Sequence, residues 1–363
     1  MSAPLPPLLS SRRRWLIHAA AGASALALPF CANALPARRL AFPRDFGSHP
    51  ERGTEWWYIT GHVQAQGRLL GFQLTFFRSR VPSTQKLRSA LAARQLVFAH
   101  AALTDVAGKR QLHAQRSARE GMGLAHARES DTDVQLGNWW LRRAPSASGT
   151  AAQASRYEAH IAGDGFDLEL QLQTTQPLLL QGSAGLSRKG PDEAQASYYY
   201  SQPQLSVMGH ITLDGRKLAI DAGAANRAWL DHEVSDALLH PEAEGWDWIG
   251  MNLDDGSALW AGGSWRAPGQ TARIFGAEEV VFTPLRWWTS PGSRARYPVE
   301  WRVATPAGDW KVEALLDAQE LDSRASTGTI YWEGLCELRE AESGQLRGRG
   351  YLEMTGYAQR LKL

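Results

Sequence analysis

The sequence predicts an all-β protein whose antiparallel strands close into sandwiches or barrels, and three observations predict this class. Apolar and polar residues alternate along segments such as residues 72–76 and 166–173, which is the period of a half-buried strand. Glycine-containing turns separate these segments, for example at Gln66-Gly67, Asp214-Gly215 and residues 254–256. Helical periodicity is scarce. Strand, turn and strand at this spacing point to a sandwich or barrel.

The first element along the chain is an export signal. Adjacent arginines in residues 11–16 precede an apolar stretch over residues 17–30, and the small-x-small site Ala32-Asn33-Ala34 predicts cleavage before Leu35. The arginines resemble a twin-arginine signal, and an ordinary secretory signal is the alternative. Residues 1–34 are therefore interpreted as a twin-arginine-type signal peptide. Either signal places the mature protein in the periplasm or outside the cell.

The mature chain is expected to form two β-barrels in tandem. A polar segment precedes the aromatic run at Tyr198, and we place a boundary there, giving residues 35–205 and 206–363, each within the size range of one barrel. Residues 83–95 are the best helical candidate, a short helix or lid between strands. Only Cys336 remains after cleavage, so an intramolecular disulfide is excluded.

Charge and motifs exclude several functions. The full chain of 363 residues has 39 Lys and Arg against 37 Asp and Glu, and removal of the signal's three arginines leaves a near-neutral protein. We therefore expect no nucleic-acid partner. The chain contains no His-Glu-x-x-His, Cys-x-x-Cys, Gly-x-Ser-x-Gly or phosphate-binding glycine loop. No metal site is predicted.

An aromatic cluster with one carboxylate occurs early in the mature chain. In a strand over residues 55–62, Glu55 and Trp57 point to one side, which offers a carboxylate beside an indole for a ligand pocket. The alternative is an edge strand whose tryptophans close the end of a barrel.

A second cluster places an acid among aromatic residues. In a strand, Trp229 and Asp231 share one face, whereas His232 lies on the other. If the Asp231 face looks into an apolar barrel, burial raises the pKa of Asp231 and keeps it protonated, as an acid catalyst requires. The alternative is a structural carboxylate paired with an arginine such as Arg227 or Arg266, or with backbone amides. Trp246 and Trp248 follow shortly afterwards.

The order of these clusters resembles the AttH-type lipocalin-like family, which is related to the carotenoid 1,2-hydratases. The resemblance covers about residues 42–363, and it is carried by these motifs: residues 55–58, 72–78, 100–105, 198–201, 229–232, 245–248, 297–301 and 331–334. It implies two tandem lipocalin-like antiparallel barrels with few short helices, in agreement with the strand pattern. In the hydratases an aromatic-x-Asp-His motif supplies the acid, and Asp231 and His232 match it, with Trp229 in place of the usual tyrosine.

The resemblance implies a cofactor-free hydratase that adds water to a C=C bond of an isoprenoid or lipid. Asp231 would donate the proton, and the Asp231 carboxylate or His232 would take a proton from water. Aromatic side chains would stabilise the cation and line the ligand site, namely Trp229, Tyr200, Tyr198, Trp246 and Trp248, with Glu55 and Trp57 beside them. The upstream His and Trp of the hydratase pocket are replaced here by residues 198–202, which puts carotenoid as the specific substrate in doubt.

Two other functions remain open from the sequence. One is a non-catalytic lipid or lipoprotein carrier that works beside an envelope ABC transporter at the membrane surface, with Asp231 ionised in a salt bridge. The other is a secreted carbohydrate hydrolase in which Glu55 and Asp231 face each other across a cleft, about 5 to 9.5 Å apart.

Overall fold

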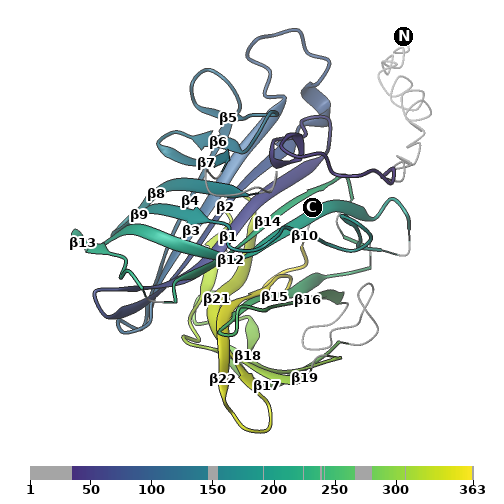
Figure 1. The fold of residues 1–363 in the computed structure, drawn as a ribbon. Coiled ribbons are helices and arrows are strands. Elements are labelled where there is room, and N and C mark those ends of the chain that lie inside the picture. The colour runs from purple at the N-terminus through teal and green to yellow at the C-terminus, as the bar shows by residue number, and fades with distance from the viewer. Residues whose placement is uncertain are drawn as a thin grey trace, which may run out of the picture. The chain divides into compact units, whose positions relative to one another are not determined.

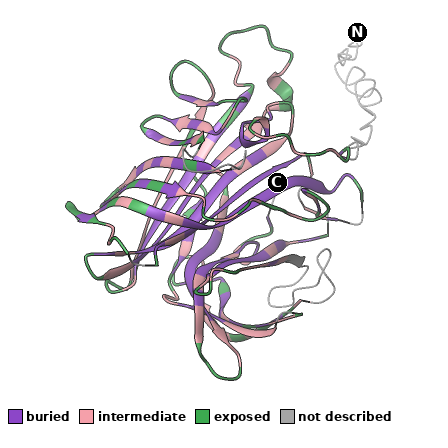
Figure 2. Cartoon of the chain, in the orientation of Figure 1, coloured by how far each residue is buried: buried purple, intermediate pink, exposed green. Residues whose placement is uncertain are grey.

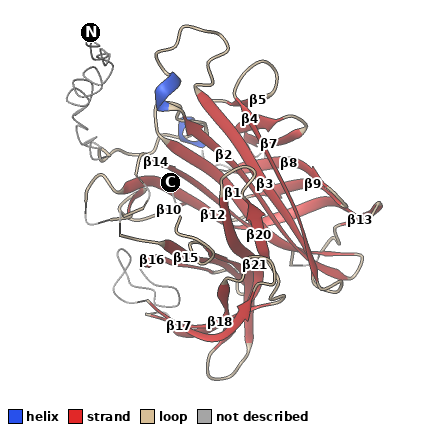
Figure 3. Ribbon diagram, turned by 180° about the vertical axis from the view of Figure 1, so that it is seen from behind, coloured by secondary structure: helices blue, strands red, loops and turns tan. Residues whose placement is uncertain are grey.

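The computed structural model describes residues 35–361, except 146–153, 191, 224, 238, 241, 266–279 and 307. The predicted signal peptide, residues 1–34, lies outside the described residues. Strands dominate, and the two helices of the described chain are short 3-10 turns, η1 (Arg44–Phe46) and η2 (Pro82–Thr84), as Figure 3 shows. None of the described helices has the length and apolar character needed to cross a membrane. The predicted all-β class is confirmed.

The first sheet contains 14 of the described strands, and every strand pair in it is antiparallel. Its order is β4-β3-β2-β1-β14-β12-β9-β8-β7-β6-β5, and β10, β11 and β13 also pair with β12 (Figure 1). The strands are β1 (Thr54–Ala65), β2 (Arg68–Arg80), β3 (Gln95–Asp105), β4 (Arg110–Arg119), β5 (Ala125–Ala127), β6 (Asp133–Leu136), β7 (Trp139–Pro145), β8 (Ser155–Gly163), β9 (Phe166–Gln173), β10 (Leu179–Leu180), β11 (Leu186–Arg188), β12 (Ala196–Leu213), β13 (Arg216–Ala219) and β14 (Arg227–Ser235).

The second sheet contains eight of the described strands, in the order β16-β15-β22-β21-β19-β18-β17, with β20 paired to β21. Its strands are β15 (Gly245–Leu253), β16 (Ala258–Trp265), β17 (Val281–Thr289), β18 (Arg296–Thr305), β19 (Gly308–Ala314), β20 (Glu320–Ser323), β21 (Thr329–Glu340) and β22 (Leu346–Met354).

Each sheet curls around its own apolar core in the manner of a lipocalin barrel. In the first sheet, β3 and β4 at one edge contact β5, β6 and β8 near the other. The inner face of that sheet carries residues such as Trp57, Ile59 and Leu230, and the inner face of the second carries Trp301 and Trp332. Strand alternation explains this segregation, because successive side chains point to opposite faces.

The faces that point away from these cores pack against each other, and we call them the shared face. Tyr58 and Trp229 of the first sheet join Trp248, Leu335 and Tyr351 of the second in one buried cluster. Strands β1 and β14 are consequently buried on both faces over most of their length (Figure 2). A strand that is covered on both sides shields its side chains from water, which disfavours the charged form of any ionisable group on it.

The structure can be compared with two further predictions from the sequence, a helix and a domain boundary. The predicted helix over residues 83–95 is wrong: only η2 forms, and Leu87 and Leu91 are exposed, because no element packs against them. The predicted boundary at residues 205 and 206 falls inside β12, and the first sheet continues to Ser235. Ala34–Leu363 form one compact unit, so the division into two domains stays a prediction.

Candidate functional site

Asp231 lies on the shared face, 3% exposed, and holds three hydrogen bonds from side chains. Its Oδ1 accepts from Ser201 Oγ at 2.5 Å and from Trp229 Nε1 at 2.7 Å, and its Oδ2 accepts from Tyr199 OH at 2.6 Å. The strand register brings these groups together, because Ser201 is the partner of Asp231 across β12 and β14. All three donors are neutral.

The charge state of Asp231 follows from this setting. Burial raises the pKa of Asp231 to about 7, against the three hydrogen bonds that lower it. No Lys, Arg or His of the described residues forms an ion pair with Asp231. Of the two arginines predicted as its partners, Arg227 donates to Gln204 Oε1 instead. The other, Arg266, lies outside the described residues. Asp231 can therefore hold a proton near neutral pH, and a protonated Oδ1 could donate to Ser201, since a hydroxyl also accepts.

Aromatic side chains from both sheets surround the acid. Tyr199 OH accepts hydrogen bonds from Trp260 Nε1 at 3.1 Å and from Trp248 Nε1 at 3.4 Å. Tyr58, which faces Asp231 across β1 and β14, meets Trp248 edge to face with ring centroids 5.2 Å apart. Trp246 and Trp260 are only half-buried, so the site approaches solvent on the side of β15 and β16.

His232 does not share the Asp231 site. It lies on the inner face of the first sheet, where it stacks on Trp57 with ring centroids 4.6 Å apart. Its Nδ1 lies 3.1 Å from Tyr200 OH, and burial lowers the pKa of His232. Trp57 and Tyr200 are likewise inner-face residues, fully buried in the first core. These three predicted site residues are close together, but behind the strand that carries Asp231.

Glu55 belongs to a buried ionic network at the end of the first barrel. Its carboxylate accepts from Arg78 Nε at 2.8 Å, from the His49 backbone amide at 2.9 Å, and from Ser48. Although burial opposes ionisation, the neighbouring His232, His49 and Arg78 hold the pKa of Glu55 well below its usual range. Glu55 and Asp231 lie on opposite faces of the sheet, so the structure does not bring the two carboxylates of the hydrolase hypothesis together.

The same network contains the one group of the described residues with the composition of a metal site. His49, Glu55 and His232 offer one ligand atom each within 4.8 Å. His49 Nδ1 already lies 3.1 Å from Glu55 Oε2, and the Arg78 guanidinium balances the carboxylate charge. These contacts account for the group as an ion-pair network that fixes residues 45–55 to the barrel.

The remaining predicted residues divide between the two faces. Tyr198 packs with Leu35 and Val234 at the barrel end, and its hydroxyl donates to the Pro36 carbonyl at 2.6 Å. Trp246 and Trp248 lie on the shared face with Trp229. Of the predicted ligand-binding residues, Trp229, Trp246 and Trp248 are therefore grouped with Asp231.

Several groups on the shared face were not predicted from the sequence. Tyr199, Ser201, Trp260 and Tyr58 surround Asp231, and the carboxyls of Glu333 and Glu353 come from β21 and β22. Alternation places Tyr58 on the face opposite Trp57, and Tyr199 on the face opposite Tyr198 and Tyr200. It could therefore have found both tyrosines once the face that carries Asp231 was known. The approach of Glu333 and Glu353 depends on packing between sheets, for which the sequence gives no signal.

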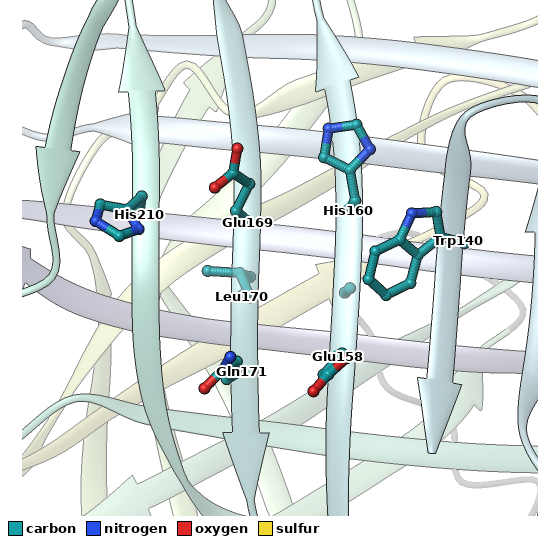
Figure 4. A pocket seen from close by; sticks show the side chains of 8 residues that line it. Trp140, Glu158, His160, Glu169, Leu170, Gln171 and His210 are labelled. Carbon is teal, nitrogen blue, oxygen red and sulfur yellow. The ribbon is translucent and has the colours of Figure 1, made fainter. Parts of the chain in front are cut away.

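Two surface hollows lie apart from this site. The larger, of about 370 Å³, lies over β7, β8, β9 and β12 and is lined by residues that include Trp140, His160, Glu169 and His210 (Figure 4). Its lining takes part in a half-buried pair, His160 with Asp167 at 3.1 Å, and in an exposed pair, Glu169 with Lys217 at 2.9 Å. The smaller, of about 260 Å³, includes His62, Gln204 and Arg227 in its lining. Asp231 lines neither hollow.

The fold and site define a class: an all-β protein of two lipocalin-like antiparallel sheets with a buried acid where they meet. The sequence profile of the AttH-like family matches residues 33–357, and the chain belongs to that family. The predicted family resemblance is confirmed. No curated protein matches the sequence.

Solved structures agree with this assignment. An AttH-type protein from Nitrosomonas europaea is 42% identical, and the match covers 89% of this chain and 99% of that one, with a TM-score of 0.77. Kievitone hydratase from Nectria haematococca is 16% identical, with 88% of this chain and 94% of that chain covered and a TM-score of 0.63. At that identity, the second likeness is one of fold.

Proposed function

We propose that this protein is a cofactor-free hydratase that adds water to a C=C bond of an apolar, isoprenoid-like substrate between its two sheets. The observation that carries the proposal is Asp231, a buried carboxyl with a pKa of about 7 and only neutral hydrogen-bond partners among the described residues. A general acid works best when its pKa lies near the operating pH.

The surroundings of Asp231 suit the reaction that we propose. Protonation of a trisubstituted alkene gives a tertiary cation, and the π faces of Trp229, Trp248 and Tyr58 would stabilise it. An apolar wall also fits a substrate with a long hydrocarbon chain. The fold of kievitone hydratase is compatible with this assignment, although the likeness alone assigns no activity.

The two alternatives from the sequence lack support of this kind. A carrier with an ionised, salt-bridged Asp231 predicts a cationic partner, and the described residues offer none to Asp231. A hydrolase with Glu55 and Asp231 across a cleft needs both on one face, and they point to opposite faces of the first sheet. The periplasmic location, the membrane contact and the transporter partner stay predictions.

The test is native mass spectrometry with lipid extraction, comparing the wild type with Asp231→Asn. Each protein is also incubated with squalene or lycopene in isotopically labelled water. Wild type is expected to yield the alcohol, and Asp231→Asn is expected to be slower by at least about 10²-fold, the usual contribution of a general acid. Asp247→Asn is the matched control, because Asp247 is buried nearby but accepts from Tyr357 at 3.0 Å. Equal, unmodified lipid in wild type and Asp231→Asn, with no alcohol formed, would favour the carrier.

A further inference from the structure

The shared face carries a pair of carboxyls besides Asp231. Glu333 of β21 and Glu353 of β22 are direct partners in the strand register. The Cβ atoms of two residues at such positions are about 4.5 to 5.5 Å apart, so two carboxyls there repel each other when both are ionised. Glu333 is 1% exposed, and Glu353 is partly buried. A single proton shared by the pair relieves the repulsion.

Three buried oxygens beside this pair, Tyr58 OH, Tyr351 OH and Glu333 Oε1, form no hydrogen bond of normal geometry with another described residue. The Tyr58 hydroxyl nevertheless interacts with the Glu333 carboxyl. Tyr58 comes from the first sheet, whereas Tyr351 and Glu333 come from the second. Unpaired buried polar groups are unfavourable, so their concentration at one place indicates a position built to receive a small hydrogen-bonding group.

Tyr58 connects the carboxyl pair with the acid of the proposed reaction. It is the register partner of Asp231 across β1 and β14, and Glu333, Glu353 and Asp231 all act on its hydroxyl electrostatically. Burial and these carboxyls raise the pKa of Tyr58 well above its usual value, so the hydroxyl keeps its proton and can relay one. The Tyr58 hydroxyl is thus electrostatically coupled to all three carboxyls.

We propose that Glu333 and Glu353 form the second proton-transfer group of this site: the pair holds the attacking water and takes its proton, and Tyr58 returns the proton to Asp231. This inference rests on the proposed hydratase function and supplies the base that His232, on the other face of β14, does not provide.

The proton balance of the cycle closes without another reactant. Asp231 gives its proton to one alkene carbon, and the π electrons form that C–H bond and leave a cation at the other carbon. A lone pair of water forms the C–O bond, and the excess proton of that oxygen passes to the ionised carboxyl of Glu353. Glu333 then passes a proton to the Tyr58 hydroxyl, which gives its own to Asp231. One alkene and one water yield one alcohol.

Other ionisable groups around the pair keep it from ionising fully. Burial raises the pKa of Glu333 well above its usual range, and Glu353 adds to the effect. Burial and the carboxyls of Asp231 and Glu233 raise the pKa of Glu353 to about 7, against the Trp246 indole, which lowers it. Glu233 is itself paired with Lys189 at 2.6 Å. The other titratable side chains on this face near the pair are Tyr58, Tyr331 and Tyr351. Asp247, whose register partner Met354 belongs to the inner core of the second sheet, acts on Glu353 only electrostatically.

The experiment separates the two proton transfers. Wild type, Asp231→Asn, Glu353→Gln and Tyr58→Phe are incubated with squalene or lycopene in deuterated water. Glu353→Gln is expected to form alcohol at least about 10²-fold more slowly, because its base is absent, yet to exchange deuterium into the recovered alkene through a cation that reverts. Asp231→Asn is expected to lose both reactions. Glu337→Gln is the matched control, since Glu337 lies on β21 but pairs with Arg339 and Arg349.

A second readout needs no substrate. In carbon-labelled protein followed by NMR, Glu333 and Glu353 are expected to titrate together in two steps, and Glu353→Gln is expected to reduce these to one. Separate titration of both groups at ordinary carboxyl pH overturns the inference, as does normal alcohol formation by Glu353→Gln. If the wild type neither forms alcohol nor exchanges deuterium, the hydratase proposal fails, and the reaction assigned to the carboxyl pair fails with it. Coupled titration of Glu333 and Glu353 would in that case still establish the shared proton.

Discussion

Trp57 stacks on His232 across β1 and β14, with an interplanar angle of 19°, on the inner face of the first sheet. This contact fixes the direction of the residue after Trp57 and of the residue before His232. Tyr58 and Asp231 must then point together towards the second sheet, because side chains alternate. The stacked pair therefore acts as a positioning element for the acid, although neither ring reaches it.

Removal of the Trp229 indole N–H is expected to raise the pKa of Asp231. The N–H donates to Asp231 Oδ1 at 2.7 Å and so stabilises the charged carboxylate. A hydrogen bond to a charged group is worth about 1.5 to 3 kcal/mol, so Trp229→Phe should move the pKa of Asp231 upwards from about 7 by about one to two units. Carboxyl NMR titration checks this. Trp248→Phe, whose indole reaches Tyr199 and not Asp231, should give a smaller shift; equal shifts would contradict the assignment.

The stability of the protein is expected to depend on pH through Asp231. Its pKa is about 7 when folded and about 3.9 when unfolded, so between these values the folded state binds more protons. The contribution of Asp231 to the free energy of unfolding is fully present below pH about 4 and is lost as the pH rises through about 7. Urea unfolding at several pH values should therefore show a gap between Asp231→Asn and wild type that moves in favour of the variant as the pH rises. A constant gap would mean that Asp231 is ionised in the folded protein.

The ionic network at the barrel end is expected to be structural. Arg78→Met leaves the buried Glu55 carboxylate without its guanidinium and should lower the free energy of unfolding by about 3 to 5 kcal/mol. Arg302→Met, which breaks an exposed pair with Asp309, should change it little. Denaturant titration measures both. If Glu55→Gln altered ligand binding without loss of stability, Glu55 would belong to the ligand site instead.

The contact between the sheets is expected to be energetically coupled through His100 and Tyr331. His100 Nδ1 lies 2.8 Å from Tyr331 OH, and both groups are buried. A double-mutant cycle with His100→Phe and Tyr331→Phe should give a coupling free energy of about 1 kcal/mol. Additive effects of the two substitutions would show that this bond contributes nothing to holding the sheets together.

The sequence predicted which residues share a face better than it predicted what each face contacts. Alternation correctly separated Trp229 and Asp231 from His232. A barrel interior and a contact between two sheets both bury side chains, so the pattern could not tell one from the other. The family resemblance predicts Tyr198 and Tyr200 for the site, whereas Tyr199, the residue between them, donates a hydrogen bond to Asp231.

The acid of the proposed site was predictable and its companions were not. Asp231 stands in a recognisable aromatic motif within one strand. Glu333 and Glu353 reach the same region only because β21 and β22 pack on the first sheet, which is a long-range contact with no local signature.

The position of β14 between β1 and β12 has a consequence for how the chain is made. As the polypeptide leaves the ribosome, β1 is among the first strands to emerge, yet its neighbour on one side is not synthesised until residues 227–235. Until then one edge of β1 has no partner, and closing such a distant contact makes folding slow. The unpaired edge of β1 makes such a nascent chain prone to aggregation, and a chaperone that covers this edge would protect the chain until β14 is synthesised.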